Sequence, residues 1–180
     1  SATLFLTEFW FAVTIVLVTG MAFYELCGLV GISQKLARIF WVSCYLLGCL
    51  AYFISDIARE PLIFFSFLVW ILAILSVVFY PQGSWVFRKR YTSSILGALL
   101  LSGAAFSVLA IRESTDGYFW FFWLLVLTTS VDAGGYFVGR KFGKTPLAPK
   151  VSPGKTVEGL AGGVFACLVI CGTLNFVFVS

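Results

Sequence analysis

Six long apolar runs limit how this chain can fold more than any other feature of its sequence. Most of them reach the roughly 17–25 residues that an α-helix needs to cross about 30 Å of hydrocarbon at 1.5 Å per residue. Because lipid offers the backbone no hydrogen-bond partners, each run is predicted to be a helix. We therefore expect an all-α integral membrane protein with about six transmembrane helices, in which residues 1–180 form a single polytopic membrane domain. The runs are Phe9–Tyr24, Leu36–Ser55, Leu62–Tyr80, Ser94–Ile111, Tyr118–Val138 and Val157–Val179.

The composition excludes the main soluble alternative and several kinds of site. Hydrophobic residues make up 61% of the chain and charged residues only 11%, whereas a soluble domain carries roughly a quarter of charged residues. That leaves too little polar surface for a water-facing helical bundle. The chain has no histidine, which excludes His-based zinc sites and Ser-His-Asp triads within it. Its five cysteines form no CxxC pair and are interpreted as apolar packing residues.

The cations are concentrated in the loops that follow the odd-numbered helices. These loops carry ten lysines and arginines, against Arg59 and Arg112 in the other loops. By the positive-inside rule the cation-rich loops face the cytoplasm. Their charge favours anionic headgroups or phosphates and not nucleic acid, because no basic domain with solvent-facing aromatic residues is present. The ten residues are Lys35, Arg38, Arg88, Lys89, Arg90, Arg140, Lys141, Lys144, Lys150 and Lys155.

An aspartate, Asp132, lies inside the fifth apolar run. A carboxylate within a membrane segment costs on the order of 2.5–3.5 kcal/mol on insertion scales, so such a residue usually faces the protein interior and has a partner. One interpretation is a structural ion pair with Arg140 or Lys141. The interpretation that we favour is a carboxylate that coordinates a cation or faces a substrate in a water-filled cytoplasmic cavity.

The cytoplasmic loop between the last two runs, residues 139–157, combines cations with three prolines that stiffen its backbone. Ser152 followed by Pro153 matches a helix N-cap and first helical position, so the last helix is expected to open at Ser152–Lys155. A helix N-terminus favours an anion, and Lys150, Lys155 and Thr156 add charge and a hydroxyl. The loop is therefore predicted to bind phosphate or pyrophosphate; ordinary positive-inside charge is the alternative.

The tripeptide Gly-Lys-Thr occurs twice in this loop, at Gly143–Thr145 and Gly154–Thr156. A P-loop needs a further glycine five positions before the glycine of this tripeptide. Val138 and Pro149 occupy those two positions. Neither copy is therefore a P-loop.

The stretch "DAGGYFVGRKFGKTPLAPKVSPGKTVEGLAGG", which starts at Asp132, closely resembles the loop of the CDP-diacylglycerol synthases (phosphatidate cytidylyltransferases). That family shows an Asp-Ser/Thr/Ala-Gly-Ala/Gly-Tyr start, a Gly-Arg/Lys-x-Phe-Gly-Lys element and an end similar to "KVSPGKTxEG". The residues "FYEL" at Phe23–Leu26 also resemble the glutamate-bearing end of an early helix in the family.

The resemblance implies a membrane-embedded nucleotidyltransferase of phospholipid biosynthesis. Its substrates would be CTP and phosphatidic acid, and its products CDP-diacylglycerol and pyrophosphate. It further implies Mg²⁺ or another divalent cation at Asp132, catalytic roles for Asp132 and Lys155, a homodimer, and the bacterial inner membrane. The residues implied to bind substrate phosphates are Lys144, Lys150, Ser152, Lys155 and Thr156.

The sequence departs from the family pattern in one respect. The family's C-terminal signature, which contains His-Gly-Gly followed by Asp-Arg-x-Asp, is absent. We interpret the chain as the N-terminal and middle part of such an enzyme, inactive alone, with a metal site completed by acidic residues that this chain lacks. Two alternatives stay open: a polyprenol or isoprenoid lipid kinase or CTP-transferase, and a non-enzymatic transporter or channel subunit with Asp132 as an ion site. A transporter or channel subunit would be expected to contain an inverted repeat of hydrophobic segments, and none is found in the sequence.

Overall fold

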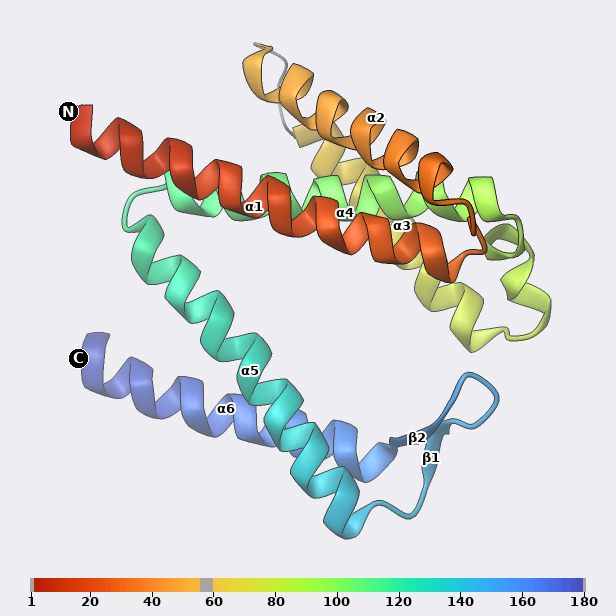
Figure 1. Cartoon of the computed structure of the whole chain (residues 1–180). Coiled ribbons are helices and arrows are strands. Elements are labelled where there is room, and N and C mark those ends of the chain that lie inside the picture. Colours follow the sequence, from red (N-terminus) through yellow and green to blue (C-terminus); the bar gives the residue numbers. More distant parts are fainter. Residues whose placement is uncertain (1, 56–59, 180) are drawn as a thin grey trace. The chain divides into compact units, whose positions relative to one another are not determined.

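The computed structural model describes residues 2–55 and 60–179, and six long helices dominate it (Figure 1). All six are long and apolar enough to cross a membrane, which confirms the prediction of an all-α, multi-pass membrane protein. A 3₁₀-helix and a short two-stranded hairpin complete the described elements. In chain order they are α1 (Ala2–Leu29), α2 (Lys35–Ile54), α3 (Glu60–Val78), η1 (Gln82–Arg88), α4 (Arg90–Glu113), α5 (Gly117–Phe142), β1 (Pro146–Ala148), β2 (Ser152–Thr156) and α6 (Val157–Val179).

The helices are longer than several of the apolar runs that predict them. Helix α1 continues to Leu29, and α5 continues through Arg140 and Lys141 to Phe142. Cationic side chains at a helix end reach the membrane surface while the backbone stays helical. The apolar run therefore marks the lipid-facing part of each helix and underestimates its length. Arg59, which entered the count of cations, lies outside the described residues.

The chain divides into two compact units, residues 1–110 and 111–180, and each is described by itself. In the first unit, buried side chains of α1, α2 and α4 form a core that includes Phe23, Tyr45 and Phe106. The rings of Phe23 and Tyr45 lie 4.9 Å apart. Cys27 and Cys49 are buried in the same core and form no disulfide, which confirms their packing role.

In the second unit, α5 and α6 pack against each other through glycines (Figure 1). A Cβ atom added at Gly134 of α5 would lie 2.7 Å from the carbonyl oxygen of Gly162 and 3.1 Å from Cα of Gly163. A Cβ atom at Gly159 would lie 3.0 Å from the carbonyl oxygen of Gly135. Small residues let helix backbones approach this closely in a membrane. Gly159, Gly162 and Gly163 of α6 therefore make tight contacts with α5 within one chain.

The loop between α5 and α6 contains the β1–β2 hairpin. The two strands are antiparallel, and Pro146 pairs with Thr156 while Ala148 pairs with Ser152. This hairpin was not expected from the sequence. It projects from the end of the unit where α5 ends and α6 begins (Figure 1).

The hairpin corrects the expected start of the last helix. Ser152–Lys155 does not open a helix, because pairing with β1 keeps these residues extended. Helix α6 instead begins at Val157, and Thr156 caps it: the Thr156 hydroxyl accepts a hydrogen bond from the Gly159 N–H at 3.1 Å. Ser152 is therefore a strand residue, and the helix N-terminus lies four residues later than predicted.

Candidate active site

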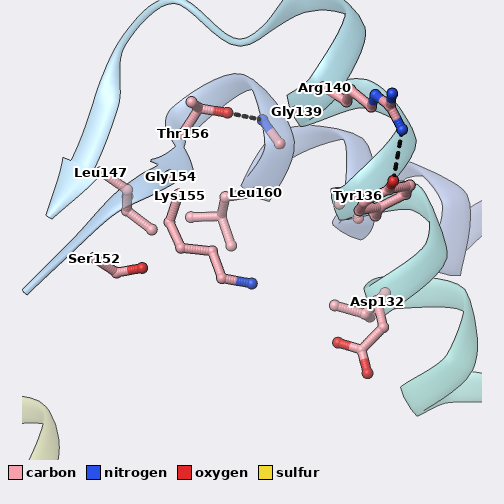
Figure 2. A pocket seen from close by; sticks show the side chains of 14 residues that line it. Asp132, Tyr136, Gly139, Arg140, Leu147, Ser152, Gly154, Lys155, Thr156 and Leu160 are labelled. Atoms are coloured by element: carbon pink, nitrogen blue, oxygen red, sulfur yellow. Dashed lines mark hydrogen bonds between the residues drawn. The ribbon is translucent and has the colours of Figure 1, made fainter.

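An open pocket of about 840 Å³ lies between α5, the hairpin and the first turns of α6 (Figure 2). Its size falls in the range of about 300–1,000 Å³ that is usual for small-molecule sites. Four residues predicted from the sequence to form the site line this pocket: Asp132 from α5, and Ser152, Lys155 and Thr156 from β2. Residues from two helices and a hairpin thus meet at one surface.

Asp132 lies on the face of α5 that is turned to the pocket. Its carboxylate points into the open space and not toward Arg140 (Figure 2). Among the described residues, Asp132 forms no ion pair with Arg140 or Lys141, so the structural ion pair considered from the sequence is not formed. A carboxylate with no protein partner is available to a ligand or a cation.

Tyr136 and Arg140 continue the same face of α5. They follow Asp132 by four and eight residues, which places all three side chains along one side of the helix. The Arg140 Nη1 atom donates a hydrogen bond of 2.8 Å to the Tyr136 hydroxyl, and both residues line the pocket. From the sequence, Arg140 is a loop cation and a possible ion-pair partner of Asp132, and Tyr136 is not singled out. The four-residue spacing from Asp132 was the signal that could have identified them.

Lys155 reaches the pocket from the opposite wall. The extended backbone of β2 directs its side chain into the space that Asp132 also faces (Figure 2). Lys155 and Asp132 form no ion pair with each other in the described part of the chain. Together with Arg140, Lys155 gives the pocket two cationic groups against one carboxylate, a balance that suits an anionic ligand.

The two other lysines predicted to bind phosphate lie elsewhere on the loop. Lys144 and Lys150 are exposed and are not among the described residues that line the pocket. Lys144 precedes β1, and Lys150 lies in the turn between the strands. The structure therefore brings together Asp132, Ser152, Lys155 and Thr156, but not these two.

Glu158, in the first turn of α6, is a residue that the sequence reasoning missed. Its carboxylate accepts hydrogen bonds from the backbone N–H groups of Lys144 and Thr145, both at 3.1 Å, and from the Thr145 hydroxyl at 2.8 Å. Acidic residues are stabilising in the first turn of a helix because the free N–H groups there are partly positive. That preference marks Glu158 in the sequence but does not reveal its partners.

Among the described residues that line the pocket, Asp132 is the one carboxylate that it offers to a divalent cation. No group of three or more His, Cys, Asp or Glu side chains that could hold a metal is found in residues 2–55 and 60–179. Mg²⁺ is commonly bound through one or two carboxylates together with substrate phosphates and water. The unpartnered carboxylate of Asp132 fits a cation held jointly with a phosphate ligand, and does not fit a cage built by the protein alone.

Comparisons with known proteins match this chain to one family of enzymes. Residues 1–180 match the family model described as "Cytidylyltransferase family". A phosphatidate cytidylyltransferase of Haemophilus influenzae is 38% identical over 117 residues, which cover 61% of this chain and 39% of that protein. The enzyme of the same name from Pseudomonas aeruginosa is 30% identical over 156 residues, which cover 86% of this chain and 57% of that protein.

A third relative shows how local the similarity can be. The phosphatidate cytidylyltransferase of Bacillus subtilis is 44% identical over 61 residues, which cover 34% of this chain and 23% of that protein. The chain thus spans 39% of the length of the first relative and 57% of the length of the second. No solved structure matches the chain.

Proposed function

This chain belongs to the cytidylyltransferase family, and we propose that the complete protein transfers the cytidylyl group of CTP to phosphatidic acid. The products would be CDP-diacylglycerol and pyrophosphate. The observation that carries this proposal is the pocket in which Asp132, Ser152 and Lys155 lie together beside two membrane-spanning helices. Its chemistry suits a ligand with phosphate groups and a lipid body.

The proposed reaction is a displacement at phosphorus. A phosphate oxygen of phosphatidic acid forms a bond to the α-phosphorus of CTP, and the bond from that phosphorus to the oxygen of the β-phosphate breaks. Pyrophosphate leaves with the electron pair of that bond. Enzymes accelerate such transfers mainly by positioning the reactants and by stabilising negative charge.

The side chains of the pocket have distinct roles in this proposal. Lys155 is the catalytic cation that stabilises negative charge on the transferring phosphoryl group, and Arg140 adds a second positive charge. Ser152 and Thr156 donate hydroxyl hydrogen bonds to phosphate oxygens. The Thr156 hydroxyl is able to do so because it only accepts in its bond to the Gly159 N–H.

Asp132 would hold a divalent cation such as Mg²⁺ together with the phosphates. When bound, the cation would offset the negative charge of the triphosphate. The carboxylate itself faces the ligand space without a protein partner, which supports this role. The remaining ligands would come from substrate, water and acidic residues outside this chain.

Lys144 and Lys150 take part in a different way. Both are exposed on the same loop without lining the pocket. We propose that they bind phosphates through the positive potential of the loop, which raises the local concentration of anionic substrates.

The membrane setting of the proposal follows from charge and apolar surface. Residues 139–157 would face the cytoplasm, because cation-rich loops favour the cytoplasmic side of a membrane. The membrane would be the inner membrane of a bacterium. Leu147 and Leu160 line the pocket beside its polar groups, which supports a ligand with an apolar part. The single polytopic domain for residues 1–180 and the homodimer stay predictions.

An assay of the complete protein in detergent tests the function. Radiolabelled CTP is supplied with phosphatidic acid, and label in the lipid phase and released pyrophosphate are measured. We expect incorporation by the native protein and a loss of about 100-fold or more in Asp132→Asn, because the cation that would offset the phosphate charge loses its carboxylate ligand. Asp116→Asn is the matched control, because Asp116 lies at the N-cap position of the same helix, makes no capping bond through its side chain and lies outside the pocket, and asparagine tolerates its positive φ of 61°.

Three outcomes would contradict parts of this assignment. Incorporation that Asp132→Asn leaves unchanged would remove Asp132 from the chemistry. Transfer to a polyprenyl phosphate in place of phosphatidic acid would identify a different lipid substrate. No transfer to any lipid phosphate by the native protein would overturn the proposed function.

A further inference from the structure

Glu158 joins the start of α6 to the turn that follows α5. Its Oε2 atom accepts hydrogen bonds from the N–H groups of Lys144 and Thr145, each at 3.1 Å. Its Oε1 atom accepts a bond of 2.8 Å from the Thr145 hydroxyl. Bonds to an ionised acceptor are stronger than bonds between neutral groups. We call this set of contacts the Glu158 clamp.

The clamp acts where the hairpin is anchored. Thr145 directly precedes β1, and its carbonyl oxygen accepts a hydrogen bond of 2.9 Å from the Val157 N–H. The next residue, Pro146, pairs with Thr156 of β2. A turn held at Thr145 therefore holds the β1 partner of Thr156, the residue that follows Lys155.

The clamped turn also fits closely against the helix start. A Cβ atom added at Gly143 would lie 2.8 Å from the hydroxyl oxygen of Thr156. The Gly143 N–H donates a bond of 2.9 Å to the Gly139 carbonyl oxygen and ends α5. Only a residue without a side chain allows the turn to approach Thr156 in this way.

Glu158 does not itself belong to the pocket. It is absent from the described residues that line the pocket, and both of its carboxylate oxygens accept hydrogen bonds from the turn. A free carboxylate beside a phosphate site would repel the ligand. The clamp instead directs this charge toward N–H and O–H donors on the side of Lys144 and Thr145.

The two Gly-Lys-Thr copies therefore have different tasks. In Gly143–Thr145, the backbone N–H groups and the threonine hydroxyl bind Glu158. In Gly154–Thr156, the lysine side chain enters the pocket and the threonine hydroxyl caps α6. The first copy holds the hairpin that carries the second.

We propose that Glu158 is a positioning residue for the reaction: by clamping Lys144 and Thr145 it holds the hairpin so that Lys155 faces Asp132 across the pocket. This inference rests on the proposed function for its catalytic consequence. The clamp itself is independent of any substrate, so it is tested separately.

Amide hydrogen exchange of the complete protein without substrate tests the clamp. In a peptide that spans Gly143–Leu147, the exchanging amides are those of Lys144, Thr145 and Leu147, because Pro146 has none. We expect exchange about tenfold faster in Glu158→Gln than in the native protein, since glutamine replaces one acceptor oxygen by an NH2 donor in a site where all the partners are donors. Exchange that remains at the native rate would overturn the clamp.

Glu60→Gln is the matched control. Glu60 lies in the first turn of α3 as Glu158 lies in the first turn of α6, so both substitutions remove the same favourable charge from a helix start. Glu60 makes none of the contacts of the clamp. Faster exchange of Gly143–Leu147 in this control would show a general loss of stability and would overturn the specific role of Glu158.

Kinetics of the same variants test the positioning role. We expect Glu158→Gln to lower kcat/KM for CTP by about 10- to 100-fold, the effect of a displaced catalytic group, and to leave KM for phosphatidic acid unchanged. Lys155→Ala should lower kcat/KM by a smaller factor in the Glu158→Gln background than in the native protein, because the effects of substitutions at residues that act together are not additive.

The Thr145 hydroxyl is tested by a pair of substitutions. Thr145→Ser should retain the activity that Thr145→Val loses, because serine keeps the hydroxyl donor to Oε1 of Glu158.

The outcomes separate the clamp from the proposed function. Faster exchange together with lower, non-additive kcat/KM supports the inference. Faster exchange with native kinetics in Glu158→Gln, when Asp132→Asn is inactive, would overturn the positioning role and leave the proposed function intact. A native protein that transfers no cytidylyl group would overturn the proposed function and with it the catalytic part of this inference.

Discussion

At the scale of single residues, two lysines with identical neighbours have different surroundings. Lys144 and Lys155 both stand between glycine and threonine. Lys144 lies in a turn and presents its backbone N–H to Glu158, whereas Lys155 lies in β2 and presents its side chain to the pocket. Local sequence therefore does not determine which lysine faces the pocket; the hairpin does.

A pair of alanine substitutions tests this difference. We expect Lys155→Ala to lower kcat of CTP incorporation by about 100-fold or more, because a cation directed at the reacting phosphates is lost. Lys144→Ala should lower kcat/KM by less than about tenfold and more weakly at high salt, because only a screened, long-range attraction is lost. Steady-state kinetics at two ionic strengths measure both. Equal losses in the two variants would mean that the pocket does not distinguish the lysines.

At the scale of elements, the glycine-lined contact between α5 and α6 positions the site. Gly134 meets Ala166 and the backbone of Gly162 and Gly163, directly after the turn of α5 that carries Asp132. The distance between the two helices therefore sets the distance between Asp132 and the residues at the start of α6. A side chain in this contact would separate the two walls of the pocket.

Gly134→Ala is expected to destabilise the protein by about 1–3 kcal/mol, because the added methyl group would overlap with backbone atoms of α6 that have no space to move. Gly172→Ala is the control within α6, since a Cβ atom at Gly172 meets nothing within 4 Å. That substitution should be neutral or stabilising by up to about 1 kcal/mol, because alanine favours a helix. The midpoint of thermal unfolding in detergent measures both. A stable Gly134→Ala variant would show that the helices are not in close contact.

The elements also show which parts of the fold the sequence can reveal. All six helices were predictable because length and apolarity are properties of each segment alone. The start of α6 was not: Ser152–Pro153 matches a helix start locally, but pairing with Pro146–Ala148 keeps that segment extended. Asp132 could be singled out because a charge in an apolar run is unusual, whereas the contacts of Glu158 could not be predicted, because its partners lie 13 and 14 residues away in the chain.

At the scale of the whole molecule, the helices have apolar surfaces suited to lipid and the loops carry charges suited to water. Large apolar side chains such as Trp10 and Leu29 are 61% and 87% exposed, as lipid-facing residues are. The loop of residues 139–157 is polar, and it contributes Arg140, Ser152, Lys155 and Thr156 to the pocket. A lipid substrate with a phosphate headgroup requires such an arrangement, because its acyl chains stay in the bilayer while its phosphate reaches the pocket.

Protection of a cysteine in the hairpin tests the central claim, that this pocket binds CTP on the cytoplasmic side. In a variant whose five native cysteines are replaced, Ser152→Cys lines the pocket and Val151→Cys is its exposed neighbour outside it. A membrane-impermeant maleimide should label both cysteines only from the cytoplasmic side. CTP with Mg²⁺ should slow the labelling of Ser152→Cys by about tenfold or more, as expected for near-saturating ligand. Val151→Cys should react at its original rate under the same conditions. Labelling of Ser152→Cys from the opposite side, or at a rate that CTP does not change, would contradict the account.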